Sequence, residues 1–163
     1  VVLNSEMGHR AQRGEISTEA LWQWVAEHLN LGNDLPTFRQ DFWRGDYADK
    51  ILIDFMHNLK RYYRLAVISN ATDDLLVTLE GYQLLRLFDI IVASAFEGIM
   101  KPNPVIYERT LNRLNLAPEE TVFIDDAVAN VLTAREVGMH AVHFTSDVDL
   151  RSELALLGIR IAD

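Results

Sequence analysis

Two adjacent carboxylates, Asp125 and Asp126, follow directly on a short apolar run, and they are the residues of this sequence best suited to chemistry. Val122 to Ile124 read as a buried strand, and residues 128–137 follow as a helix. Unpaired charge is costly to bury, so two acids at the tip of a buried strand suit a core poorly. Hard divalent cations, in contrast, prefer carboxylate oxygens. The pair therefore predicts a cation site at the end of this strand.

Two further strand ends carry polar groups. Ser69 and Asn70 follow a strand predicted over 65–68, at the start of a helix whose free N–H groups favour an anion. Lys101 lies in the loop after a strand predicted over 89–93. Ligands of open parallel sheets bind beyond the carboxyl ends of the strands. We therefore expect a hydroxyl, an ammonium group and a carboxylate pair to converge on one crevice, which suits a phosphate dianion with Mg²⁺.

The elements that would position these groups alternate along most of the chain. Strands are expected over 65–68, 89–93, 122–124 and 141–144, and helices over 49–63, 73–87, 104–114, 128–137 and 147–157. Such alternation indicates a parallel sheet covered by helices on both faces. Residues 1–46 read as helices alone, with Ser17 as the N-cap of a helix over 18–30.

Composition narrows the range of functions. The 163 residues, 49% of them hydrophobic, fit one globular domain with room for a small second lobe. The net charge of −9 disfavours nucleic acid as a partner. No apolar run approaches the roughly 20 residues that cross a bilayer, and the first ten residues do not resemble a signal peptide, so no membrane is expected. The absence of cysteine excludes disulfides, thiolate zinc sites and a cysteine nucleophile, and is compatible with a reducing cytoplasm.

Each candidate residue also has an ordinary structural interpretation. A serine at a strand end is commonly a turn residue or helix cap, and an exposed lysine is commonly solvated. An Asp-Asp pair commonly caps the helix that follows it. Trp22, Trp24 and Trp43 could line a ligand pocket, although burial preferences favour a place in the core. The joint pattern of polar strand ends, in this order, is what favours a functional site.

That order resembles the motifs of the haloacid-dehalogenase superfamily. SNAxxD at 69–74, MKPNPxIY at 100–107 and VFIDDxxxN at 122–130 resemble its motifs II, III and IV. The likeness is to phosphatase-like members, such as the N-terminal phosphatase domain of epoxide hydrolase and bacterial sugar-phosphate phosphatases. It covers essentially all 163 residues. It implies a small all-helical cap over 1–46 and a Rossmann-like α/β core over 47–163.

The resemblance implies a role for each matching residue. Ser69 would donate its hydroxyl to a phosphoryl group that Asn70 helps to position, and Lys101 would bridge the phosphate and the nucleophile. The other polar residues would hold Mg²⁺ and its waters: Asp126 as a ligand, with Asp125 and Asn130 in support. Whether Asn130 touches the metal stays open. The implied reaction is hydrolysis of a small phosphorylated metabolite through an aspartyl-phosphate.

One departure from the family concerns the nucleophile, which belongs to an Asp-x-Asp motif at the tip of a first strand. Nothing in residues 1–40 reads as such a strand, and at 147–149 (Asp-Val-Asp) the first acid is better placed as a helix N-cap. By resemblance, the missing strand would lie in the centre of the sheet, between the strands ending at Ser69 and Ile124. We therefore expect the chain alone to be inactive. We also expect those two strands to pair directly, or a second chain or a missing N-terminal segment to fill the gap, because unpaired backbone groups are costly.

Three other functions are alternatives to a phosphatase. A non-catalytic relative that binds a phosphorylated ligand or a partner is favoured by the missing nucleophile, but disfavoured by Ser69, Lys101 and Asp126 occurring together. A haloacid dehalogenase needs no metal, so the carboxylate at Asp126 argues against it. A phospho-acceptor receiver domain is excluded because its acid pair precedes its hydroxyl and lysine. Substrate specificity would come from the cap, and its nearest charged candidates are His9, Arg10 and Arg13. The same three residues can also be interpreted as the solvated face of a helix.

Overall fold

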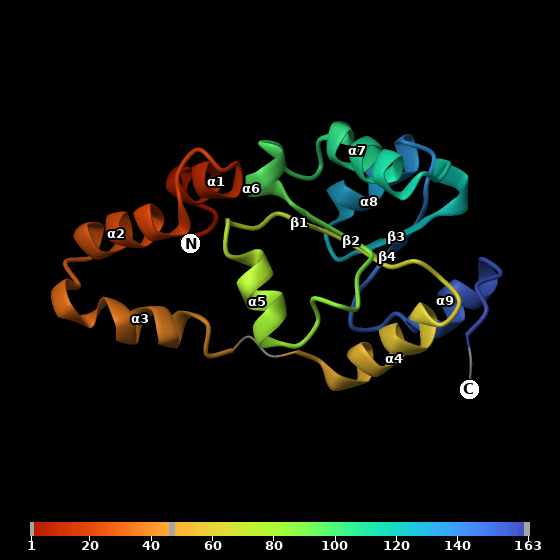
Figure 1. Ribbon diagram of the computed structural model, residues 1–163, viewed down its shortest axis with the longest axis horizontal. Helices are drawn as coiled ribbons and strands as arrows, with labels where there is room; N and C mark the ends of the chain where they lie inside the picture. The colour runs from red at the N-terminus through yellow and green to blue at the C-terminus, as the bar shows by residue number, and fades with distance from the viewer. Residues whose placement is uncertain (1, 46–47, 162–163) are drawn as a thin grey trace.

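The N-terminal part of the protein is an arm of helices (Figure 1). The computed structural model describes residues 2–45 and 48–161. The arm contains α1 Glu6–Gln12, α2 Thr18–His28, the 3₁₀ helix η1 Gly32–Asp34 and α3 Leu35–Phe42. Ser17 caps α2 as expected, by accepting a hydrogen bond from the Ala20 backbone. The boundary expected between cap and core, at 46 and 47, lies outside the described residues, so the division into two domains stays a prediction.

Strands and helices then alternate in the expected order. The elements are α4 Lys50–Lys60, β1 Ala66–Ser69, α5 Leu75–Gly81, β2 Ile90–Ala93, α6 Ser94–Glu97, α7 Pro104–Leu114, the 3₁₀ helix η2 Pro118–Glu120, β3 Val122–Asp125, α8 Val128–Glu136, β4 His140–His143 and α9 Leu150–Leu156. In Figure 1, α7 and α8 lie on one side of the strands, and α4 and α9 lie on the other. The α/β class, with parallel strands covered on both faces, is therefore confirmed. In the described part of the chain, no helix has both the length and the apolar character to cross a membrane.

The strands form two separate parallel pairs. Ala66 to Ser69 of β1 pair with Ile90 to Ala93 of β2, and Val122 to Asp125 of β3 pair with His140 to His143 of β4. No hydrogen-bonded ladder joins β1 to β3. Of the two alternatives expected for these strands, direct pairing is therefore wrong for this structure, and a further segment that fills the gap stays a prediction.

A cavity of about 1200 Å³ lies between the two pairs, and we call it the slot. Residues 66–68 of β1 and 122–125 of β3 line it. Consecutive side chains of a strand point to opposite faces, so a cavity lined by consecutive residues lies at the edge of the strand. Its walls above and below are apolar side chains of α4 and α7, among them Phe55, Leu59 and Leu111. Both helices thus border the slot.

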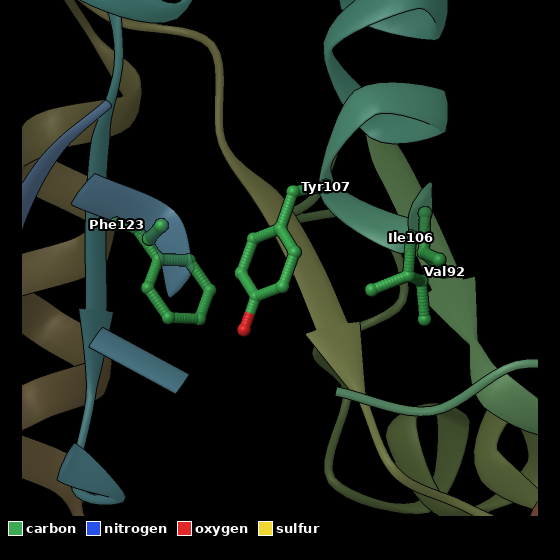
Figure 2. Packing of buried hydrophobic residues seen from close by; sticks show 5 residues of the cluster. Val92, Ile106, Tyr107 and Phe123 are labelled. Atoms are coloured by element: carbon green, nitrogen blue, oxygen red, sulfur yellow. The ribbon is translucent and has the colours of Figure 1, made fainter. Parts of the chain in front are cut away.

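The core cluster that joins the pairs is centred on Tyr107 of α7. Figure 2 shows the Tyr107 ring between Phe123 of β3 and the side chains of Ile106 and Val92. The Tyr107 and Phe123 rings meet edge to face, with centroids 5.1 Å apart. Such aromatic pairs add about 0.5–1.5 kcal/mol beyond the area they bury. The two strand pairs are thus held in one body by side chains and not by a continuous sheet.

The described arm is anchored to the core at its own turn. The backbone N–H and the hydroxyl of Thr18 both donate to the Asp73 carboxylate, the former at 3.0 Å. Gly14 has φ +70° and lies so close to α6 that a Cβ there would be 2.0 Å from the Ala95 carbonyl oxygen. A left-handed conformation and a close backbone approach both require glycine at this position. Residues 14–18 therefore fix the arm beside the ends of the strands.

The tryptophans belong to the packing of the arm. Trp22 is 1% exposed, and its ring meets Phe38 and Phe42 edge-on at 6.4 and 5.4 Å. Trp24 stacks on His28, and Trp43 is 42% exposed. None of the three lines the slot or the second cavity described below. The core interpretation is therefore correct for Trp22.

Several boundaries differ from those expected. The helix predicted over 73–87 is only α5, which ends at Gly81 before Gln83 takes a positive φ of 60°. The last helix is capped by Asp149 and not by Asp147, which instead accepts a hydrogen bond from the Thr145 hydroxyl. Helix α6 lies where only a loop was expected. These are local hydrogen-bonding choices that hydrophobic periodicity does not record.

Candidate functional site

The candidate site lies where β1, β3 and the loop after α6 meet. Ser69 and Asp125 are the last residues of β1 and β3, so each lies one position inside the strand it was expected to follow. Lys101 comes from the loop that links α6 to α7. The structure joins four of the predicted residues by direct hydrogen bonds, in the order Asn70, Lys101, Asp125 and Asn130.

Asn70 holds the loop that carries Lys101, here called the lysine loop, against the end of β1. Its Nδ2 donates to the Lys101 carbonyl oxygen at 2.8 Å, and its Oδ1 accepts from the Lys101 N–H at 2.7 Å. Both polar atoms of the amide are used by the backbone of one residue. Asn70 therefore positions Lys101 in this structure, which is a more specific task than the resemblance implied.

Lys101, in the loop between α6 and α7, forms a buried ion pair with Asp125 at the end of β3. The Lys101 Nζ donates to the Asp125 Oδ2 at 2.6 Å, with the side chains 11% and 6% exposed. The Asp125 Oδ1 accepts from the Ala127 N–H at 2.8 Å and from the Asn130 Nδ2 at 2.9 Å. Burial raises the pKa of Asp125, but the hydrogen bonds from Lys101, Ala127 and Asn130 outweigh it and hold that pKa below its usual value. Asp125 is therefore an ionised carboxylate with both oxygens engaged.

Asp126 differs from its neighbour, because its carboxylate is exposed and makes no hydrogen bond or ion pair with any described residue. Its backbone carbonyl is 2.9 Å from the His143 Nε2 of β4. The Ser69 hydroxyl likewise has no partner among the described residues. Lys101 has three donor hydrogens, of which one is used by Asp125. The groups free to meet a ligand are thus a carboxylate, a hydroxyl and part of an ammonium group.

Asn130 is hydrogen-bonded to Asp125. It is 9% exposed and gives its amide N–H to the Asp125 carboxylate, while its backbone carbonyl accepts from the Tyr107 hydroxyl at 3.1 Å. Sequence reasoning missed both Tyr107 and His143. Tyr107 closes the MKPNPxIY motif, and that place was the signal that could have singled it out. Nothing in the sequence marks His143.

The donor chemistry suits a hard cation in part. Asp126 offers a free carboxylate oxygen, and Mg²⁺ commonly binds through one or two carboxylates while it keeps several waters. Within residues 2–45 and 48–161, no three His, Cys, Asp or Glu side chains gather into a metal site. A Mg²⁺ ion at Asp126 would therefore take its remaining ligands from water, substrate or another segment.

A second cavity, of about 750 Å³, lies between α1 and the lysine loop. Asn70 and Lys101 line it from the core, and His9, Gln12 and Arg13 line it from the arm. Arg10, the third charged candidate of the arm, is not in its lining and forms an ion pair with Glu15 instead. Gln12 was not anticipated from the sequence. We call this space the cap cavity.

Parallel strands with polar ends that meet beside two cavities define an α/β protein with a candidate ligand site at the strand tips. The sequence profile of the haloacid dehalogenase-like hydrolases matches residues 12–138, and the chain belongs to that family. It is 30% identical over 161 residues to a sesquiterpene phosphatase of Aspergillus oryzae, covering 96% of this chain and 81% of that protein.

Other relatives match over shorter stretches. A D-ribitol-5-phosphate phosphatase of Bacteroides thetaiotaomicron is 25% identical over 124 residues, which cover 71% of this chain and 60% of that protein. The bifunctional epoxide hydrolase 2 of Rattus norvegicus is 40% identical over 57 residues, 35% of this chain but only 10% of that protein. Two of these three relatives are named phosphatases, and their names give different substrates.

Solved structures share the fold. A HAD-like family hydrolase from Porphyromonas gingivalis superposes with a TM-score of 0.78 at 25% identity, over 96% of this chain and 81% of that one. A HAD family enzyme from Bacteroides thetaiotaomicron in a magnesium complex has a TM-score of 0.77 at 18% identity, over 93% of this chain and 80% of that one. At 18% identity, the likeness to the enzyme from Bacteroides thetaiotaomicron concerns the fold alone.

Proposed function

We propose that this site serves Mg²⁺-dependent hydrolysis of small phosphate monoesters through an aspartyl-phosphate. The observation that carries the proposal is the contrast within the acid pair. Asp125 is buried and saturated by Lys101, Ala127 and Asn130, whereas the adjacent Asp126 carboxylate is free. One acid thus fixes the lysine, and the other is available to a cation.

The free groups have complementary tasks toward a phosphate dianion. The Ser69 hydroxyl would donate to one phosphoryl oxygen. The two remaining donor hydrogens of Lys101 would neutralise charge on the other phosphoryl oxygens. Because the lysine is largely shielded from water, this interaction would be stronger than in solution. Asp126 would hold Mg²⁺, which supplies further neutralisation when bound. Asn70 and Asp125 would keep Lys101 in place, because its backbone and its ammonium group are each anchored.

The nucleophile would come from a segment that fills the slot. The slot is bordered by the open edges of β1 and β3 and is lined by Asp125 and Asp126. An extended segment parallel to both strands would end beside Lys101. A carboxylate oxygen there would attack phosphorus while the ester P–O bond breaks, and the departing alkoxide would take a proton from a general acid carried by the same segment and leave as the alcohol. Water would then release phosphate and restore the carboxylate. A second chain or an N-terminal segment could supply this strand.

This proposal makes the 163-residue chain alone inactive. Loss of a covalent nucleophile can cost on the order of 10⁶ in rate. The test is hydrolysis of p-nitrophenyl phosphate with Mg²⁺, by the chain alone and by the chain extended at its N-terminus with an apolar strand and Asp-x-Asp. The extended chain should turn over, and its Asp-x-Asp→Asn-x-Asp version should not. Turnover by the short chain that disappears in Asp126→Ala would show that the nucleophile is misplaced.

Metal binding gives a test that does not need turnover. Calorimetric titration of the chain with Mg²⁺ should show weak binding that is lost in Asp126→Ala. Asp149→Ala, which removes a helix cap elsewhere, is the control and should bind as the unmodified chain does. Equal affinity in the chain and in Asp126→Ala would refute the assignment of the metal to Asp126.

A second candidate is a non-catalytic relative that binds a phosphorylated ligand or a partner. The free Ser69 hydroxyl and the remaining Lys101 donors support it, because they can bind a phosphoryl group without a nucleophile. The extension experiment separates the two candidates. A longer chain that folds, closes the slot and still fails to hydrolyse the ester would favour the non-catalytic function. A dehalogenase remains the weaker alternative, since it leaves the free Asp126 without a task.

A further inference from the structure

The cap cavity borders the proposed phosphate site at Lys101 and Asn70, whereas Asp125 and Asp126 line the slot. Lys101 and Asn70 belong to its lining, and its opposite wall comes from α1 and the residues before it. An ester whose phosphate lies at Lys101 would direct its alcohol portion either into solvent or into this space. At about 750 Å³, the cavity is large enough for a small metabolite. The side chains on the α1 wall are therefore the ones that would meet the alcohol.

Gln12 is the buried polar side chain of that wall. It is 6% exposed, and its Nε2 donates to the Leu3 carbonyl oxygen at 2.7 Å. That bond fixes the orientation of the amide and leaves Oε1 as an acceptor with no partner among the described residues. No unpaired side-chain nitrogen or oxygen of these residues is sealed from solvent. The Oε1 atom is therefore accessible, and the cavity is the space that Gln12 lines.

The charges around Gln12 are already compensated. Arg13 is bound to Glu15 at 2.6 Å and to Glu6 at 3.4 Å, and Lys101 is bound to Asp125. The polar groups left without partners on the same wall are the His9 ring and the Asn4 amide, together with the Gln12 oxygen. These groups donate and accept single hydrogen bonds, as hydroxyl groups do. The unpaired polar groups of the wall thus suit hydroxyls better than a second anion, while Leu3, Ile99, Met100 and Pro102 give the cavity apolar surface as well.

We propose that Gln12 is a specificity-determining residue, whose Oε1 accepts a hydrogen bond from a hydroxyl on the alcohol portion of the bound phosphate ester. The substrate class is then a hydroxylated alkyl phosphate and not a purely hydrocarbon one. This inference rests on the proposed function, because it needs the phosphate at Lys101. An ester without hydroxyls would displace water from Oε1 and leave a buried acceptor unpaired. A site built to bind a hydroxyl rejects analogues that lack it.

Two probes of similar size test the inference on the chain as it exists. Glycerol 1-phosphate and propyl phosphate differ in two hydroxyls, and their binding can be followed by ³¹P NMR titration of the 163-residue chain with Mg²⁺. Glycerol 1-phosphate should bind at least about fivefold more tightly, from one net hydrogen bond to a buried partner. Gln12→Met should remove this preference and leave the affinity for propyl phosphate within about twofold. Gln23→Met, at an exposed position of α2 outside the cavity, should keep the preference.

The outcomes separate the two proposals. Equal binding of both esters by the unmodified chain would overturn the role of Gln12, whatever the variants do. A preference that survives in a folded Gln12→Met would also overturn it, because another group would then read the hydroxyl. If Gln12→Met loses its helical circular dichroism, Gln12→Asn, which withdraws the oxygen by one methylene, gives the same decision. Binding of neither ester would refute the phosphate site itself, and with it both proposals.

Discussion

Replacement of Lys101 by methionine tests whether the lysine and Asp125 form a buried ion pair that stabilises the packing of the two strand pairs. The variant keeps the volume of the side chain but removes its charge. Asp125, 6% exposed, would keep two of its three hydrogen bonds, from Ala127 and Asn130. Removal of one partner from a buried pair costs about 3–5 kcal/mol, and the remaining donors place the expected loss at about 3 kcal/mol. That is a large part of a total stability of about 5–15 kcal/mol.

Urea unfolding at pH 7, followed by far-ultraviolet circular dichroism, measures this loss as a lower midpoint at an unchanged slope. The matched control is Lys60→Met, which removes the cation from a more exposed pair with Asp89, where Nζ and Oδ2 are 2.5 Å apart and the side chains are 29% and 32% exposed. Exposed pairs contribute about 0–1 kcal/mol, so the control should lose no more than about 1 kcal/mol. The double variant Lys101→Met/Asp125→Asn should regain most of the loss, since no buried charge is left unpaired.

The pH dependence gives an independent reading. In the unmodified chain the pKa of Asp125 is lowered, so its contribution is present above the unfolded pKa of about 3.9 and is lost as pH falls through the folded pKa. In Lys101→Met, burial is less opposed and the pKa of Asp125 rises. The deficit of the variant should therefore shrink as pH falls from 7 toward 4. A deficit below about 1 kcal/mol at pH 7, no larger than that of Lys60→Met, would refute the buried pair.

Three further substitutions test local features of the fold by the same urea assay. Gly14→Ala should destabilise by about 2–4 kcal/mol, because φ is +70° and the new Cβ would meet the Ala95 carbonyl; a neutral result would contradict this close approach. Tyr107→Phe should lose about 1 kcal/mol, because the buried Asn130 carbonyl loses a donor, and unchanged stability would mean that the bond does not form. Ser17→Ala should lose about 1 kcal/mol of helix capping, and a value near zero would place the start of α2 elsewhere.

The sequence predicted those elements whose ends carry their own signals. Helix α7 runs over Pro104–Leu114 as expected, because Asn103 caps it, Pro104 suits its first turn and Asn115 takes the left-handed conformation that ends it. Gly138, with φ +99°, follows the end of α8 in the same way. The helix predicted over 73–87 did contain a stop signal, Gly81, but apolar residues continue past it into turns that pack in the same cluster as α5, so the apolar pattern alone extended the helix too far.

The site was predictable to the extent that motifs mark it. Residue types and order pointed to the strand tips, but they could not divide the tasks of the acid pair. That division depends on which carboxylate faces Lys101, which is a property of three-dimensional packing. Gln12 was beyond sequence reasoning for a related reason. A glutamine on an arm helix looks like any solvated residue until the burial of its amide against Leu3 is known.

The placement of the tryptophans allows two spectroscopic signals, indole fluorescence and circular dichroism, to report on different parts of the protein. All three indoles lie at positions 22, 24 and 43, in the described arm, whereas every described strand lies beyond residue 65. Indole fluorescence therefore observes the arm, and the circular dichroism of the whole backbone is dominated by the longer remainder. If the arm loosens from the turn at Gly14 and Thr18 before the core unfolds, the fluorescence transition will precede the dichroism transition. The contacts of Thr18 with Asp73 oppose this loosening.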